Sequence, residues 1–181
     1  MGAQLRPWVT EAICPFLGLT SKSVVLDPCC RDGSVLAAIK PIPRMLLGFE
    51  LDASEPLARG LEARVTRRDA LSPADWAGRV AITHVVSRPP LSIAVHLAQR
   101  AMGEVFSTGG SVALLLPLSF LSSDKRSAFH NQHPADLFVL NRRPTIDGRG
   151  NQGDYGWFVW HHQACWRWQV LQLPSAKRGH R

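Results

Sequence analysis

The chain alternates short apolar runs with amphipathic segments, a pattern that is typical of strands followed by helices. Apolar runs of strand length lie at residues 23–27, 44–50, 65–68, 80–87 and 111–116. Segments with helical character lie at residues 5–17, 34–40, 53–63, 92–106 and 119–130. Pro15 interrupts the first of these segments, and Pro41 and Pro43 end the second. Strands that alternate with helices imply parallel βαβ units, so the sequence predicts an α/β fold with a doubly wound, mostly parallel sheet.

The pattern changes after residue 135, where no helical segment separates the apolar runs. Strand-like runs lie at residues 137–140, 156–160 and 166–173. The polar, glycine-containing segment at residues 141–156 is expected to form an exposed loop. Strands that follow one another without a helix predict an antiparallel C-terminal edge of the sheet. We therefore expect one domain at residues 1–173 and a flexible basic tail at residues 174–181.

Length and composition narrow the class of protein. The chain has 181 residues, 45% of them hydrophobic and 19% charged, which suits one folded α/β domain rather than a disordered chain. No apolar run approaches the roughly 18 residues that cross a bilayer. The first residues include Glu11 and Pro15, which are unusual in a signal peptide, so a cytoplasmic protein without a membrane partner is expected. The four cysteines lack metal-ligand spacing, and no metal site is expected.

The charge balance points to a polyanionic partner. Lysine and arginine together number 21 against 14 acidic residues, which gives a net charge of +7. Most of the basic residues are arginines, whose forked guanidinium groups suit phosphate. Nucleic acid is therefore a plausible partner. The alternative is that the positive charge only keeps the protein soluble.

Acidic residues stand at the ends of three successive predicted strands. Asp27 precedes a turn of mostly short side chains at residues 28–33, and the helix that begins near Ser34 offers free N–H groups to a ligand. Glu50 lies 23 residues after Asp27, a spacing that suits a carboxylate gripping ribose hydroxyls. Asp69 is placed to accept a hydrogen bond from an adenine amino group. Such acids also cap turns and helices, but three at successive strand ends favour a ligand site on one rim.

These segments resemble, in order, the motifs of class I S-adenosylmethionine-dependent methyltransferases. The matching segments are VVLDPCCRDG at residues 24–33, GFELD at 48–52, RDAL at 68–71, VVSRPPL at 85–91 and ALLLP at 113–117. The late segments RPT at residues 143–145 and DYGWFVW at 154–160 are similar to small phage-type DNA N6-adenine methyltransferases. The resemblance covers roughly residues 5–162 and implies a Rossmann-like methyltransferase fold.

The resemblance also implies a site for S-adenosylmethionine. Asp27 and the backbone that follows it would hold the methionine portion, Glu50 the ribose hydroxyls and Asp69 the adenine amino group. The implied cofactor-binding residues are Asp27, Pro28, Cys29, Cys30, Asp32, Gly33, Glu50 and Asp69. Arg31 departs from the family pattern, which has a small residue, often glycine, at that turn.

The fourth motif, which is the catalytic one, departs from the family at two side chains. The family has Asn, Asp or Ser, then two prolines and Tyr or Phe, whereas this chain has Arg88, Pro89, Pro90 and Leu91. In the family the first side chain and a proline carbonyl accept hydrogen bonds from the target amino group, and the ring stacks on the flipped base. Arginine offers no acceptor, and leucine has no π face. We therefore expect weak or absent N6-adenine methylation, or another substrate whose phosphate or carboxylate binds Arg88.

The resemblance bears on partners and function as well. In the family, the side carrying the long loop faces nucleic acid, so contacts are expected from Lys125, Arg126, Arg142, Arg143 and Arg149. No separate target-recognition domain is evident, so specificity would come from loops or from a protein partner. Two functions follow: a methyltransferase-like protein of weakened activity on nucleic acid, or a catalytically inactive nucleic-acid-binding or structural protein. A phage-encoded chain would act in the cytoplasm of a bacterial host.

Overall fold

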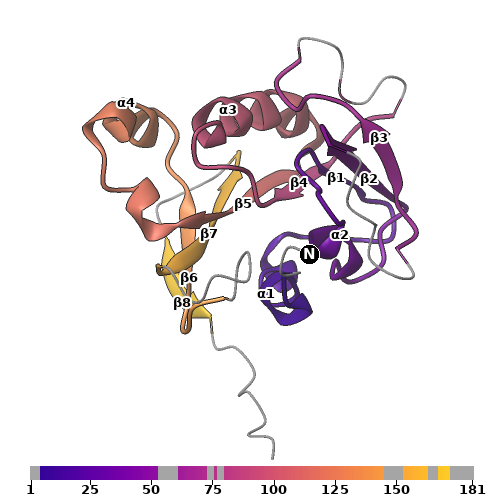
Figure 1. Ribbon diagram of the computed structural model, residues 1–181, viewed down its shortest axis with the longest axis horizontal. Helices are drawn as coiled ribbons and strands as arrows, with labels where there is room; N and C mark the ends of the chain where they lie inside the picture. The colour runs from indigo at the N-terminus through magenta and orange to yellow at the C-terminus, as the bar shows by residue number, and fades with distance from the viewer. Residues whose placement is uncertain are drawn as a thin grey trace, which may run out of the picture.

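A mixed β-sheet organises the chain in the computed structural model, which describes residues 5–52, 61–72, 76, 80–144, 153–162 and 167–171. The strands are β1 (Val24–Asp27), β2 (Met45–Glu50), β3 (Arg64–Arg67), β4 (His84–Ser87), β5 (Ser111–Pro117), β6 (Asp136–Leu140), β7 (Tyr155–His161) and β8 (Trp168–Leu171). Their order across the sheet is β3-β2-β1-β4-β5-β7-β6-β8 (Figure 1). This is the predicted doubly wound arrangement, in which the order reverses between β1 and β4.

Strand directions place the strand ends on two opposite rims. Strands β1 to β5 pair in parallel, whereas β7 runs antiparallel to both β5 and β6. The predicted antiparallel part of the sheet is thus confirmed, with β7 inside the sheet. The edge strand β8 differs from expectation because it pairs in parallel with β6. The carboxyl ends of every strand except β7 therefore share one rim.

Helices cover both faces of the sheet (Figure 1). They are α1 (Pro7–Glu11), η1 (Cys14–Phe16), α2 (Ser34–Ala37), α3 (Ala94–Val105), η2 (Phe106–Thr108), η3 (Leu118–Phe120) and α4 (Asp124–Gln132). The first core cluster joins α1 and α2 to one face, and the second joins α3 and α4 to the other. Alternate residues of β5 and β7 enter opposite clusters; Trp157 lies in the first and Trp160 in the second. No helix in the described residues is long and apolar enough to cross a membrane.

Two predicted helices differ in extent from those observed. The helix expected at residues 34–40 is the single turn α2, after which Ala38 leaves the helical region of backbone space. The helix expected at residues 119–130 is divided into η3 and α4, because Ser123 is extended. Residues 53–60, where most of another helix was expected, and the predicted tail at residues 174–181 lie outside the described part of the chain.

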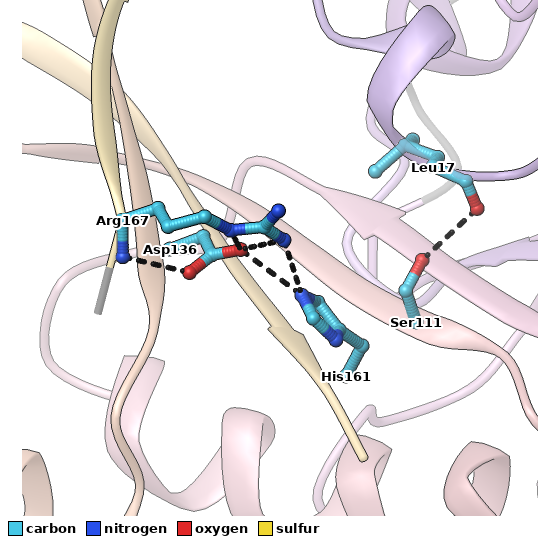
Figure 2. A network of polar contacts seen from close by, with 5 residues as sticks. All are labelled: Leu17, Ser111, Asp136, His161 and Arg167. Atoms are coloured by element: carbon cyan, nitrogen blue, oxygen red, sulfur yellow. Dashed lines mark hydrogen bonds and ion pairs between the residues drawn. The ribbon is translucent and has the colours of Figure 1, made fainter. Parts of the chain in front are cut away.

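A polar network ties the last three strands together at the rim opposite the carboxyl ends. Asp136, at the start of β6, is 1% exposed, and its carboxylate accepts hydrogen bonds from the backbone N–H (2.9 Å) and guanidinium (2.7 and 3.0 Å) of Arg167. Nε2 of His161, at the end of β7, lies 3.0 Å from the same carboxylate. Figure 2 shows these three side chains directed at one another, with Ser111 turned toward the carbonyl of Leu17.

The network also determines how Asp136 titrates. Burial by itself raises the pKa of Asp136, but hydrogen bonds from Arg167 and His161 outweigh it and lower the pKa from 3.8 to about 2. A carboxyl whose pKa is lower in the folded than in the unfolded chain stabilises the fold at pH values above its unfolded-state pKa. That stabilisation is lost as the pH falls toward 2.

Replacing Asp136 with Asn should therefore lower the free energy of unfolding by about 2 kcal/mol at pH 6, as measured by urea denaturation. The difference from the wild type should narrow as the pH is lowered from 5 to 3. Asp154→Asn is the matched control, because Asp154 is exposed in its ion pair with Arg143. That change should cost less than about 0.5 kcal/mol. Equal stabilities of the wild type and Asp136→Asn at pH 6 would show that the network contributes nothing.

Candidate functional site

A cleft of about 610 Å³ lies at the carboxyl ends of the parallel strands, beside the reversal point between β1 and β4. Several residues singled out from the sequence line it: Pro28, Cys29, Glu50, Asp69, Arg88, Pro89 and Pro90. They come from segments far apart in the chain, namely the turns that follow β1, β2, β3 and β4. The volume is within the range of pockets that hold small ligands and cofactors.

Asp27 lies beside this cleft without lining it, because its side chain is fully buried. Its Oδ1 atom accepts hydrogen bonds from the Ser87 hydroxyl (2.6 Å) and the Cys29 backbone N–H (3.0 Å). Its Oδ2 atom is buried and has no hydrogen-bond partner within the described part of the chain. Burial raises the pKa of Asp27 from 3.8 to about 7, although the two hydrogen bonds and the charge of Arg88 act in the opposite direction.

The turn after β1 accommodates Arg31 in a backbone conformation that normally favours glycine. Arg31 has a φ of 48° and Gly33 a φ of 75°, both in the left-handed region. The turn is held to β2 by a hydrogen bond from the Cys30 N–H to the Phe49 carbonyl (2.9 Å). A Cβ atom at Gly48 of β2 would lie 2.7 Å from the Cys30 sulfur, so the turn packs closely on that glycine. Arg31 is among the residues that line the cleft.

Glu50 holds this turn and the next one together. Its Oε2 atom accepts the backbone N–H of Arg31 (2.6 Å), and its Oε1 atom accepts that of Asp52 (3.0 Å). The carboxylate is thus a clasp between the turns that follow β1 and β2. Because each carboxylate oxygen has two lone pairs, the clasp leaves acceptor capacity for a ligand hydroxyl.

The other predicted acids also organise turns. Asp69 is exposed, and its Oδ1 atom accepts the Leu71 N–H (2.8 Å). Asp32 accepts the Ser34 N–H (3.1 Å). The expectation of free N–H groups at a helix beginning near Ser34 is therefore corrected for this residue, since Asp32 occupies its N–H. Cys30, Asp32 and Gly33 shape the turn and are not among the residues that line the cleft.

The residues of the fourth motif lie at the end of β4, and three of them, Arg88, Pro89 and Pro90, line the cleft. Arg88 is half-buried and Pro89 buried, while Pro90 and Leu91 are exposed. Leu91 is 38% exposed and does not line the cleft. The Pro90 carbonyl accepts the Ile93 N–H (3.2 Å), which begins the turn into α3. The cleft wall at this position therefore carries a guanidinium and proline rings.

The predicted nucleic-acid contacts lie after β5 and β6, on the same rim as the cleft but outside its lining. Lys125 is exposed at the start of α4. The Arg126 guanidinium donates to the carbonyls of Phe120 (2.8 Å) and Ser119 (2.9 Å), so it stabilises η3. Arg142 lies over the Trp8 ring at 4.5 Å, and Arg143 pairs with Asp154 at 2.9 Å. Arg149 lies outside the described residues.

Sequence reasoning did not single out several residues that shape the site. Ser87 is the most important, because its hydroxyl joins the end of β4 to Asp27. A hydroxyl at the last position of an apolar strand, directly before Arg88 and the two prolines, was the available signal. Asp52 and Arg68 also line the cleft, and the Arg68 guanidinium lies 5.0 Å from the centre of the Phe49 ring. In the described ranges, no group of three His, Cys, Asp or Glu side chains is arranged to hold a metal ion.

Comparison with known proteins identifies the fold. No family model and no curated protein matches the sequence. A type I restriction-modification methyltransferase subunit from Streptococcus thermophilus is structurally similar, with a TM-score of 0.64 and 13% identity over 90% of this chain and 45% of its own. The 23S rRNA methyltransferase ErmE has a TM-score of 0.61 and 15% identity over 90% of this chain and 71% of its own.

A dimethyladenosine transferase from Plasmodium falciparum is similar to the same degree. Its TM-score is 0.63 and its identity 14%, over 88% of this chain and 63% of its own. The chain thus spans less than half of the restriction-modification subunit and under two thirds of this transferase. At these identities the likeness shows a Rossmann-like methyltransferase fold.

Replacing Glu50 with Gln tests the clasp. The amide has one oxygen where the carboxylate has two, and its NH₂ group would face a backbone N–H, so the free energy of unfolding should fall by about 1–2 kcal/mol. Amide exchange at Arg31 and Asp52 should accelerate in the same variant. Glu11→Gln is the matched control, since Glu11 forms an exposed ion pair with Lys40. If Glu50→Gln matches the wild type in urea denaturation and amide exchange, the clasp is not stabilising.

Proposed function

We propose that the cleft binds S-adenosylmethionine and that the chain is a methyltransferase-like protein acting on nucleic acid. One observation carries the proposal: Glu50, Asp69 and Arg88 meet at a cleft on the carboxyl rim, next to the buried Asp27. Ligands of doubly wound sheets bind at this rim, where the strand order reverses. The proposal is also supported by the methyltransferase fold of the structural neighbours.

The acidic side chains and the backbone at the cleft suit the chemical groups of the proposed cofactor. The unpartnered, buried Oδ2 atom of Asp27 suits the cationic methionine end, and the backbone from Pro28 to Gly33 would lie along it. Glu50 would accept hydrogen bonds from the ribose hydroxyls, and Asp69 from the adenine amino group. The bound cofactor would supply a methyl group carried on a sulfonium.

Nucleic acid is the proposed methyl acceptor. Three structural neighbours support it, because they are a restriction-modification methyltransferase subunit, an rRNA methyltransferase and a dimethyladenosine transferase. The net charge of +7 agrees with a polyanionic partner. Of the basic residues past β5 and β6, Lys125 and Arg143 are exposed, and Arg142 packs over the Trp8 ring. Arg149 belongs to the same proposed surface by its sequence position.

Adenine is a poor acceptor at this cleft. The target amino group needs an acceptor beside it, whereas Arg88 offers donors and a positive charge. That charge also opposes the cationic character that develops on an attacking amino nitrogen. Leu91 supplies no stacking surface for an extruded base, and it lies outside the cleft lining. N6-adenine methylation by this chain is therefore proposed to be weak or absent.

A second candidate function follows from the same residues. A descendant of the methyltransferase fold that no longer transfers methyl groups would serve as a nucleic-acid-binding or structural protein, with or without the cofactor. Arg88 lines the cleft, and by the resemblance it stands where the family has a hydrogen-bond acceptor, which favours this second function.

Calorimetric titration with S-adenosylmethionine tests the central part of the proposal. The wild-type protein should bind the cofactor, and Glu50→Gln should bind it at least about tenfold more weakly because a charged hydrogen-bond acceptor is lost. The titrations should be made under solution conditions in which circular dichroism shows that the wild type and Glu50→Gln are both folded. Glu11→Gln should bind like the wild type. Absence of any heat of binding at millimolar S-adenosylmethionine would exclude cofactor binding and favour the second function.

Transfer of a labelled methyl group to DNA, followed by nucleoside analysis, tests the acceptor position. The wild type should yield no measurable N6-methyladenine, and the double variant Arg88→Asn with Leu91→Tyr should gain activity because an acceptor and a stacking ring are restored. Leu91→Tyr alone is the control and should stay inactive. Formation of N6-methyladenine by the wild type at ordinary enzymatic rates would refute the proposal that Arg88 and Leu91 prevent adenine methylation.

A further inference from the structure

The Asp27 carboxyl, beside the cleft, has one buried oxygen without a hydrogen-bond partner in the described part of the chain. The side chain is 0% exposed, and Ser87 and Cys29 both donate to Oδ1. Oδ2 receives no hydrogen bond from any residue that the structure describes. An ionised carboxylate with one oxygen buried and unpaired is costly, whereas the protonated, neutral form avoids most of that cost.

The groups that face Asp27 come from three segments. The β4 end contributes the neutral Ser87 hydroxyl and the positive charge of Arg88, and the β2 end contributes Glu50. The turn after β1 contributes Cys29 and Cys30. Burial, with the nearby carboxylates, raises the pKa of both thiols, that of Cys30 to about 12, so neither ionises near neutral pH.

In these surroundings Asp27 changes charge near neutrality. Burial dominates and raises its pKa to about 7, while Ser87, Cys29 and Arg88 limit the rise. Below that pH the carboxyl is neutral in the protein without ligand. A cation placed against Oδ2 reverses the balance, because an opposite charge within about 4–6 Å favours the ionised form.

We propose that Asp27 carries a proton on Oδ2 in the ligand-free protein and releases it to solvent when the cationic methionine end of S-adenosylmethionine enters the cleft. This inference rests on the proposed function. Asp27 thereby couples cofactor binding to pH: below pH 7 the affinity rises as the pH rises, since the proton is then easier to displace. Raising the pH from 5 to 6 should strengthen binding about tenfold.

The number of protons released is measured by titrating S-adenosylmethionine into the wild type at pH 6 in cacodylate and in imidazole, whose ionisation enthalpies differ. The α-amino group of the ligand has a pKa of about 8, so its charge is constant between pH 5 and 6.5. We expect release of most of one proton by the wild type. Asp27→Asn keeps the side-chain shape and the acceptor for Ser87, and it should release none and bind with an affinity independent of pH from 5 to 6.5.

A second measurement needs no ligand. The Asp27 carboxyl carbon, followed by ¹³C nuclear magnetic resonance, should titrate with a midpoint near pH 7 in the free protein and about three units lower with S-adenosylmethionine bound. A midpoint near 4 in the free protein would overturn the inference whatever the protein binds. Binding without proton release, or with equal release by Asp27→Asn, would overturn it while leaving the proposed function intact. Failure of the wild type to bind at any pH would refute both.

Discussion

The hydrogen bond from Ser87 to Asp27 joins the ends of β1 and β4 at the point where the order of the sheet reverses. At 2.6 Å and fully buried, it fixes the relative height of the two strand ends from which the cleft opens. The Cys29 N–H shares the same oxygen, so the course of the next turn depends on it. The chain tolerates a carboxyl in this buried place because a hydroxyl and an amide satisfy one side of it. The other oxygen, Oδ2, is buried without a hydrogen-bond partner in the described part of the chain.

The second constraint is the Glu50 clasp, which lets the turn after β1 adopt its shape without the usual glycine. Arg31 occupies the left-handed region, where a non-glycine residue costs about 1 kcal/mol or more, and the short bond from its N–H to Glu50 holds it there. The departure from the family pattern thus leaves the turn in place and puts Arg31 among the residues that line the cleft. The lining therefore carries both arginines (Arg31, Arg68 and Arg88) and acids (Glu50, Asp52 and Asp69).

Residues whose surroundings are set by one strand and its own turn could be predicted from the sequence. The buried runs Val24–Asp27 and Ser111–Pro117 are strands as expected, and the acids after β1, β2 and β3 share a rim because parallel strands end together. Features that depend on distant contacts could not be predicted. The parallel direction of β8, held by Arg167 on a carboxylate 31 residues earlier, is one such feature. The division of the helix expected at residues 119–130 has a local cause that the apolar pattern does not show: Ser123 is extended, and Arg126 donates to the η3 carbonyls.

A crystal structure of the complex with S-adenosylhomocysteine tests the proposed cofactor site most directly. The ribose of the ligand should lie at Glu50, its adenine at Asp69 and its amino group at Asp27 Oδ2, in the cleft that Arg88 also lines. A ligand seated instead in the opposite hollow lined by Phe16, Asp136 and Trp168 would contradict it. So would a cleft that remains empty in crystals grown at saturating ligand.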